Sequence, residues 1–81
     1  MDRFYLKNYL DKINENAVIT FARNHNIPLS YYEANQGLYF IRTHFDGLMN
    51  CYDKKEYIYY YFSDPFAYKL YQLIMIALSK L

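Results

Sequence analysis

The chain is poor in the residues that usually mark a disulfide framework, a metal site or a phosphate loop. Its 81 residues include one cysteine, two glycines, two prolines and no tryptophan. The single cysteine, Cys51, excludes an intrachain disulfide and a metal site built from cysteine pairs. It is typical of a reducing, intracellular setting. We therefore expect a cytoplasmic protein that holds no cofactor.

The sequence also lacks a block of charge of one sign and a long apolar run. Nine Lys and Arg stand against eight Asp and Glu, and the two signs are interleaved along the chain. A nucleic-acid-binding protein usually clusters its basic residues, so nucleic acid is not the expected partner. The longest apolar run, residues 73–78, is far shorter than a membrane span, and the first residues lack the apolar core of a secretory signal. No membrane partner is expected.

Apolar residues, and tyrosine above all, are what the chain has in abundance. Hydrophobic residues are 54% and aromatic residues 22% of the sequence, too many for a disordered protein. This length predicts a single domain, residues 1–81, and a domain this apolar often covers part of its surface with a partner or a second copy. Tyrosine suits a contact surface because it combines an apolar ring, a polar tip and a small entropy loss. A very AT-rich coding sequence would also raise the tyrosine count, without selection for binding.

The first half of the chain has the apolar repeat of helices. Residues 2–26 place apolar side chains near a 3.6-residue spacing, with Asp2 as a cap. One long helix is compatible with this pattern, and so are two helices in series with Asn16 capping the second. Residues 29–37 are ambiguous. A capping box from Ser30 favours a short helix, and a strand that turns into the next element is the alternative.

Between residues 38 and 62 the pattern changes to the alternation typical of strands. Asp46-Gly47, flanked by apolar residues, is a strong hairpin signal, and the polar residues 53–56 would turn the chain again. The resulting register sorts the side chains onto two faces. The candidate core face holds Leu38, Phe40, Met49, Cys51, Ile58, Tyr60 and Phe62. The opposite face, rich in tyrosine, holds Tyr39, Ile41, Thr43, Asn50, Tyr52, Tyr57, Tyr59 and Tyr61.

The last element begins at a typical helix start, Asp64 followed by Pro65. The apolar spacing predicts a helix over 65–80. The expected fold class is therefore α+β. It has an N-terminal helical segment, a small antiparallel sheet of about three strands over residues 38–62, and a C-terminal helix.

Cys51 and His44 are the one pair that could suggest nucleophilic catalysis. In the predicted hairpin they are diagonal neighbours, and Arg42 lies opposite the cysteine, where its charge would favour the thiolate. The simpler interpretation is a small core cysteine and a histidine beside a turn. Both glycines are used in turns, and His25 and His44 have no third metal ligand at a suitable spacing. We expect no enzyme, no catalytic residue and no metal site.

The face rich in tyrosine is the candidate contact surface, because Tyr and Arg are favoured anchors of protein interfaces. The candidate partner-binding residues are Tyr39, Arg42, Tyr52, Lys54, Lys55, Tyr57, Tyr59 and Tyr61. The leading hypothesis is a small non-enzymatic protein that docks this face, with Arg42 and the turn at residues 53–56, on a protein target and blocks it.

The chain is short, aromatic-rich, AT-biased and without an enzyme motif. In this general style it resembles the small proteins of phages and mobile elements, among them anti-CRISPR, anti-restriction and anti-toxin proteins. The resemblance implies an inhibitor that occludes a host defence protein.

Two alternatives use the same surfaces. A homodimerising structural module would bury the apolar C-terminal helix or the tyrosines against a second copy. A single-stranded nucleic-acid binder would stack bases on a tyrosine-rich sheet face, with Arg42, Lys54 and Lys55 near the phosphates. The dispersed basic residues count against the second alternative.

Overall fold

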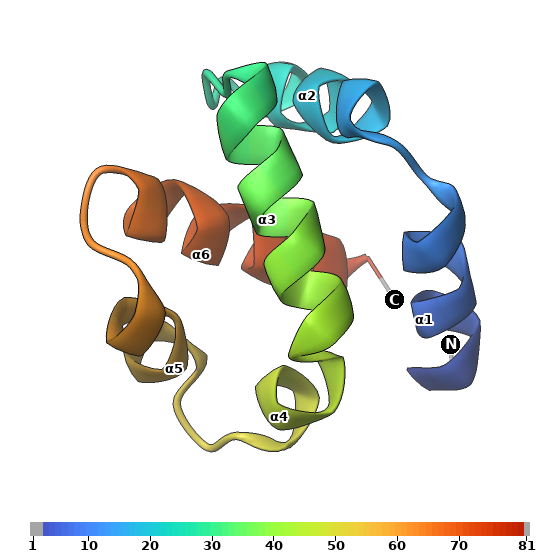
Figure 1. Ribbon diagram of the computed structural model, residues 1–81, viewed down its shortest axis with the longest axis vertical. Coiled ribbons are helices and arrows are strands. Elements are labelled where there is room, and N and C mark those ends of the chain that lie inside the picture. Colours follow the sequence, from blue (N-terminus) through green and yellow to red (C-terminus); the bar gives the residue numbers. More distant parts are fainter. Residues whose placement is uncertain (1–2, 81) are drawn as a thin grey trace. The chain divides into compact units, whose positions relative to one another are not determined.

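The structure, a computed structural model, describes residues 3–80 (Figure 1). Helices make up 78% of this part of the chain. In chain order they are α1 (Arg3–Lys12), α2 (Glu15–Asn24), α3 (Tyr31–Thr43), α4 (Phe45–Asn50), α5 (Lys54–Tyr61) and α6 (Phe66–Ser79). The chain divides into two compact units, of which the first ends at Phe45 and the second begins at Asp46. The expectation of a single domain stays a prediction.

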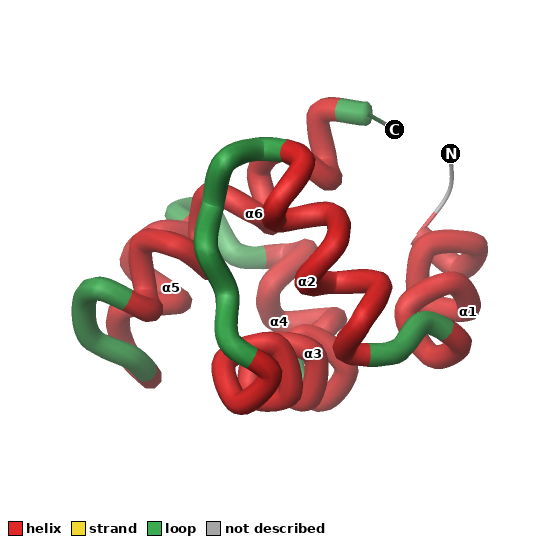
Figure 2. The backbone as a smooth tube through the Cα atoms, turned by 90° about the horizontal axis from the view of Figure 1, so that it is seen from above, coloured by secondary structure: helices red, strands yellow, loops and turns green. Residues whose placement is uncertain are grey.

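The predicted sheet over residues 38–62 does not form. These residues belong to the end of α3, to α4 and to α5, and Figure 2 shows helices and loops only over the part of the chain described. Asp46 and Gly47 lie in the first turn of α4 instead of in a hairpin, and residues 53–56 begin α5 instead of joining two strands. The α+β fold class is therefore wrong, and the described residues are all-helical.

A helical spacing is present in the same stretch, beside the alternating one. The buried residues Ala34 and Leu38 on α3 are four positions apart, and Phe45 and Leu48 on α4 are three apart, each the spacing of one helix face. α5 has no such repeat, because Ile58 is its only buried residue. Its alternating tyrosines were therefore the strongest local pattern, and they favoured a strand.

The N-terminal helical segment is confirmed, in the form of two helices in series. The side chain of Asn14, and not that of Asn16, caps the second helix by accepting a hydrogen bond from the backbone N–H of Ala17 at 2.9 Å. Asp2, the expected cap of the first helix, lies outside the described residues.

α2 ends in a Schellman motif. Asn26 adopts a left-handed φ of 63°, its N–H donates to the carbonyl of Arg23, and the N–H of Ile27 donates to the carbonyl of Ala22. This pairing satisfies carbonyls that the helix end would otherwise leave open. Ile27 is buried, so the turn also directs an apolar side chain inward.

The capping box of Ser30 is confirmed, but the helix that it starts is longer than one turn. The Ser30 hydroxyl accepts from the N–H of Glu33, and the Glu33 carboxylate accepts from the N–H of Ser30. α3 then continues through Gly37, which is buried, to Thr43. In this first unit α3 packs against both α1 and α2 (Figure 1).

In the second unit α5 and α6 pack together as a helix–loop–helix pair (Figure 2). The predicted helix over 65–80 is confirmed as α6, which buries one face: Ala67, Leu70, Leu73 and Ile74. Asp64 does not cap it. Pro65 holds the N-cap position, and the Asp64 carboxylate accepts a hydrogen bond from Tyr59 instead.

Candidate functional site

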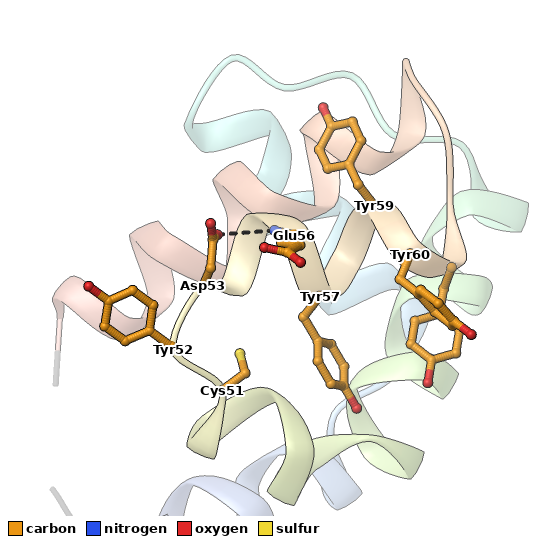
Figure 3. Close-up of a pocket in the computed structure, with 8 residues that line it drawn as sticks. Cys51, Tyr52, Asp53, Glu56, Tyr57, Tyr59 and Tyr60 are labelled. Atoms are coloured by element: carbon orange, nitrogen blue, oxygen red, sulfur yellow. Dashed lines mark hydrogen bonds between the residues drawn. The ribbon is translucent and has the colours of Figure 1, made fainter.

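The tyrosines of α5 do not share one face, because they lie on a helix and not on a strand. Each residue turns the helix by about 100°, so Tyr59 points away from Tyr57 (Figure 3). Tyr57 and Tyr61 are one turn apart, and their ring centroids lie 5.7 Å from each other. The predicted contact face, with the rings of 57, 59 and 61 side by side, is therefore wrong.

A different surface brings most of these side chains together. An open hollow of about 630 Å³ lies between the segment after α4 and one side of α5 (Figure 3). We call it the tyrosine hollow, and it is lined by Cys51, Tyr52, Asp53, Glu56, Tyr57, Tyr59, Tyr60 and Tyr61. Tyrosines are five of its eight lining residues, and every one of the eight belongs to the second unit.

The start of α5 positions the hollow. The Asp53 carboxylate accepts a hydrogen bond from the N–H of Glu56 at 3.1 Å, which caps the helix and fixes where its first turn begins. From this start, Asp53, Glu56, Tyr57 and Tyr60 fall at spacings of three and four and so lie on one side of α5. Ile58 lies on another side and is buried.

Gly47 on α4 leaves room for the Tyr57 ring, which lines the hollow. The Tyr57 hydroxyl lies so close to the Gly47 Cα that a Cβ at position 47 would overlap it. The absence of a side chain at Gly47 thus lets the Tyr57 ring lie on α4. Tyr57 is half-buried, and burial raises the pKa of its hydroxyl, helped by the charge of Tyr61 and by a hydrogen bond with it.

The rim of the hollow carries accessible rings. Tyr52 is fully exposed and the Tyr60 side chain is 82% exposed. The Tyr60 ring meets the edge of Tyr61 with centroids 5.0 Å apart. Such rings can pack on an incoming group with little change in their own conformation.

The charge in the hollow is negative. Asp53 and Glu56 are the only charged residues among its lining groups. Within residues 3–80 no hydrogen bond or ion pair engages the Glu56 carboxylate, which is exposed. The hollow therefore presents an acceptor beside aromatic rings.

The two lysines at the start of α5 do not line the hollow. Lys55 lies on the opposite side of α5, with its Nζ between 5.8 and 5.9 Å from the ring centroids of Tyr59, Tyr68 and Tyr71. These distances are within the range of cation–π attraction. Lys54 is half-buried and is not among the lining residues. Of the predicted tyrosines, Lys55 thus contacts Tyr59, and neither lysine lines the hollow.

Tyr59 contributes to the loop after α5 more than to the hollow. Its hydroxyl donates to Asp64 Oδ1 at 2.5 Å, and its ring points away from that of Tyr57 although it still lines part of the hollow (Figure 3). The hydrogen bond, burial and the charge of Asp64 together raise the pKa of Tyr59 to about 12.

Two predicted contact residues, Tyr39 and Arg42, lie on α3 in the first unit. Tyr39 is exposed. Arg42 binds within the unit, because its guanidinium donates to the carbonyl oxygens of Leu10 at 2.9 Å and Ile13 at 2.6 Å. These oxygens lie at the carboxyl end of α1, where a helix leaves acceptors unpaired and favours positive charge. Arg42 therefore links α3 to the end of α1 and acts as a structural clamp between them.

The predicted arrangement of Cys51 and His44 depended on the hairpin and is lost with it. The Cys51 thiol donates to the carbonyl of Leu48 at 3.1 Å, and the His44 ring stacks on Phe40 with centroids 4.6 Å apart. Within the part of the chain that the structure describes, no three His, Cys, Asp or Glu side chains gather as a metal site.

Sequence reasoning missed two residues of the hollow as contact residues, Cys51 and Tyr60, and it assigned Asp53 and Glu56 to a turn beside the contact face instead of to a helix start. A signal for them was present. Asp53 followed three positions later by Glu56 is a helix start, and from that start the spacing of three and four places Glu56 beside Tyr60. The alternating tyrosines that follow were weighed more heavily.

The chain matches no family model, and no curated protein or solved structure is significantly similar to it. Among the helices described, none has the length and apolar character needed to cross a membrane.

Proposed function

We propose that this chain is a non-enzymatic protein-binding protein whose contact surface is the tyrosine hollow. The observation that carries the proposal is an open concavity of about 630 Å³ in which five of eight lining residues are tyrosines. Tyrosine is enriched among the residues that dominate binding energy in interfaces, because a large ring is buried at a small entropy loss.

The accessible rings of Tyr52 and Tyr60 support this role. They line the hollow together with Glu56, so it offers both apolar area and an acceptor. A partner seated here would have the surrounding part of its own surface covered. Occlusion of this kind is how the proposed inhibitor, in the style of phage proteins that block a host defence protein, would act.

Single-stranded nucleic acid is disfavoured as the occupant. Stacking required a sheet face that the described residues do not form, and phosphate groups would meet the carboxylates of Asp53 and Glu56. Homodimerisation stays a prediction, and sedimentation of the full chain at micromolar concentration tests it. A monomer at that concentration contradicts it.

Site-specific photo-crosslinking in the source cells tests the proposal. A benzophenone amino acid replaces Tyr60 in the hollow or, as the matched control, the exposed Tyr39 on α3. We expect a protein to be captured from position 60 and not from position 39. Equal capture from both positions, capture from 39 alone, or none from either contradicts the proposal.

The captured protein is then purified and titrated with alanine variants. Tyr60→Ala should weaken binding about 30-fold, the size of a hot-spot truncation of about 2 kcal/mol. Tyr32→Ala and Tyr39→Ala, which remove equally exposed rings from α3, should leave the affinity unchanged. An unchanged affinity for Tyr60→Ala would remove the hollow from the interface.

A further inference from the structure

We propose that the tyrosine hollow receives the guanidinium group of an arginine in the partner protein. This inference rests on the proposed function and adds to it the chemistry of the bound group.

The negative charge of the hollow favours a cationic group of the partner. The charged groups that line the hollow are the carboxylates of Asp53 and Glu56, and no lysine or arginine among the described residues lines it to neutralise them. Lys55, the nearest candidate in sequence, is placed among Tyr59 and two rings of α6 on the other side of α5. A cationic group of the partner is the natural complement.

The Glu56 carboxylate lies on the same side of α5 as the Tyr60 side chain. Glu56 and Tyr60 are one turn apart on α5, which puts their Cβ atoms about 5–6 Å from each other. A planar cation that enters the hollow on this side of α5 can therefore meet both a carboxylate and tyrosine rings. A guanidinium group matches this pair, since it stacks on aromatic faces and donates two parallel hydrogen bonds to a carboxylate.

The openness of the hollow favours arginine over lysine as the bound side chain. The hollow is open and Glu56 is exposed, so a bound group keeps part of its contact with water. An ammonium group is strongly hydrated and forms a point contact, whereas guanidinium is weakly hydrated and gains from stacking at a partly wet site. Arginine is also among the residues enriched at interface cores and hot spots.

Titration of the isotope-labelled full chain with three small probes tests the inference by NMR. The probes are N-acetyl-arginine amide, its neutral isostere N-acetyl-citrulline amide, and N-acetyl-lysine amide. We expect the arginine probe to shift signals of Tyr52, Glu56 and Tyr60, with an affinity about tenfold above that of either other probe. Equal responses to arginine and citrulline, equal responses to arginine and lysine, or shifts outside the hollow overturn it.

Charge-removing variants that keep the fold give the second test. Glu56→Gln preserves size, and Asp53→Asn preserves the cap of α5, because asparagine caps as well as aspartate. Each should weaken the arginine probe several-fold, and Asp11→Asn on α1, which removes the same charge from an exposed site, should not. Unchanged binding by Glu56→Gln overturns the inference.

The same variants separate this inference from the proposed function. If Glu56→Gln with Asp53→Asn still permits full capture of the partner by the benzophenone at position 60, the arginine contact is wrong and the protein-binding role stands. If wild-type capture at position 60 fails, the protein-binding role itself is wrong.

Discussion

The Tyr59 hydroxyl is held protonated by its contact with Asp64. The hydrogen bond to Oδ1 raises the pKa of Tyr59 to about 12, above the ordinary tyrosine value of about 10. Because the folded-state pKa is the higher one, this contact stabilises the fold fully below pH 10 or so, and the contribution is lost as the pH rises through about 12.

Replacing the acceptor should lower that pKa. In Asp64→Asn the hydroxyl loses its charged acceptor, so we expect the pKa of Tyr59 to fall from its raised value. Carbon-detected NMR of labelled tyrosine rings between neutral and high pH measures this directly, and Tyr59→Phe assigns the signal. A Tyr59 that titrates near the ordinary value in the wild-type chain contradicts the hydrogen bond.

Gly47 and Tyr57 form one packing unit and should be energetically coupled. Alanine at position 47 would add about 1 kcal/mol of helix propensity, but its Cβ would overlap the Tyr57 hydroxyl. We expect Gly47→Ala to destabilise the wild-type chain by about 1–2 kcal/mol and to cost less in the Tyr57→Phe background. Urea unfolding of the two single variants and the double variant measures the coupling. Additive effects would show that the ring does not rest on Gly47.

The end of α2 requires one residue to adopt a left-handed backbone conformation. Asn26 has a left-handed φ, which asparagine tolerates and glycine adopts without strain. We expect Asn26→Gly to be neutral or slightly stabilising and Asn26→Ala to destabilise by about 1 kcal/mol. Thermal and urea unfolding of both variants check this order. If the alanine variant is as stable as the glycine variant, the Schellman motif is not the native end of α2.

The attachment of α1 depends on the Arg42 side chain. Removing its two charge-assisted hydrogen bonds in Arg42→Met should cost about 1.5–3 kcal/mol and leave the carbonyl oxygens at the end of α1 unpaired. Hydrogen exchange should then accelerate in residues 3–12 and remain unchanged in α6. Arg42→Lys keeps the charge and should lie between wild type and Arg42→Met. Unaltered exchange in α1 would exclude the clamp.

For the whole molecule, helix content is the measurement that separates the two fold classes. With 78% of the described residues in helices, the far-ultraviolet circular dichroism spectrum should have the double minimum of α-helix at high amplitude. A spectrum with the single minimum of β-structure, or with half the expected helical amplitude, would favour the α+β arrangement instead.

Helix starts that depend on local hydrogen bonds were predicted in part, since Asn14 and not Asn16 caps α2 and Asp64 does not cap α6. The capping box at Ser30 and the helix beginning near Pro65 were read from neighbouring residues alone, because a cap is satisfied within one turn. The helices in the middle of the chain were not predicted, because tyrosine and isoleucine favour strands and α5 lacks an apolar stripe. In this stretch the strand propensity and the alternating pattern both predicted a strand, whereas the structure has a helix.

The candidate site was predicted in part for the same reason. Tyr52, Tyr57 and Tyr61 were expected on a contact surface and do line the hollow. Tyr59 also lines it, but its ring points away from that of Tyr57, and Arg42 and Lys55 do not line it, because side chains two residues apart share a face only on a strand. On a helix they diverge, and each found a partner elsewhere in its own unit.

The amino-acid sequence by itself determined the concentration of tyrosine between residues 52 and 61, the single thiol, the balanced charge and the helices at both ends, since these depend on composition and on contacts within one turn. Only the tertiary structure decided how the side of α5 that carries Glu56, Tyr57 and Tyr60 lies against α4. That choice follows from the packing of the Tyr57 ring on Gly47, ten residues away in sequence, which no local pattern encodes.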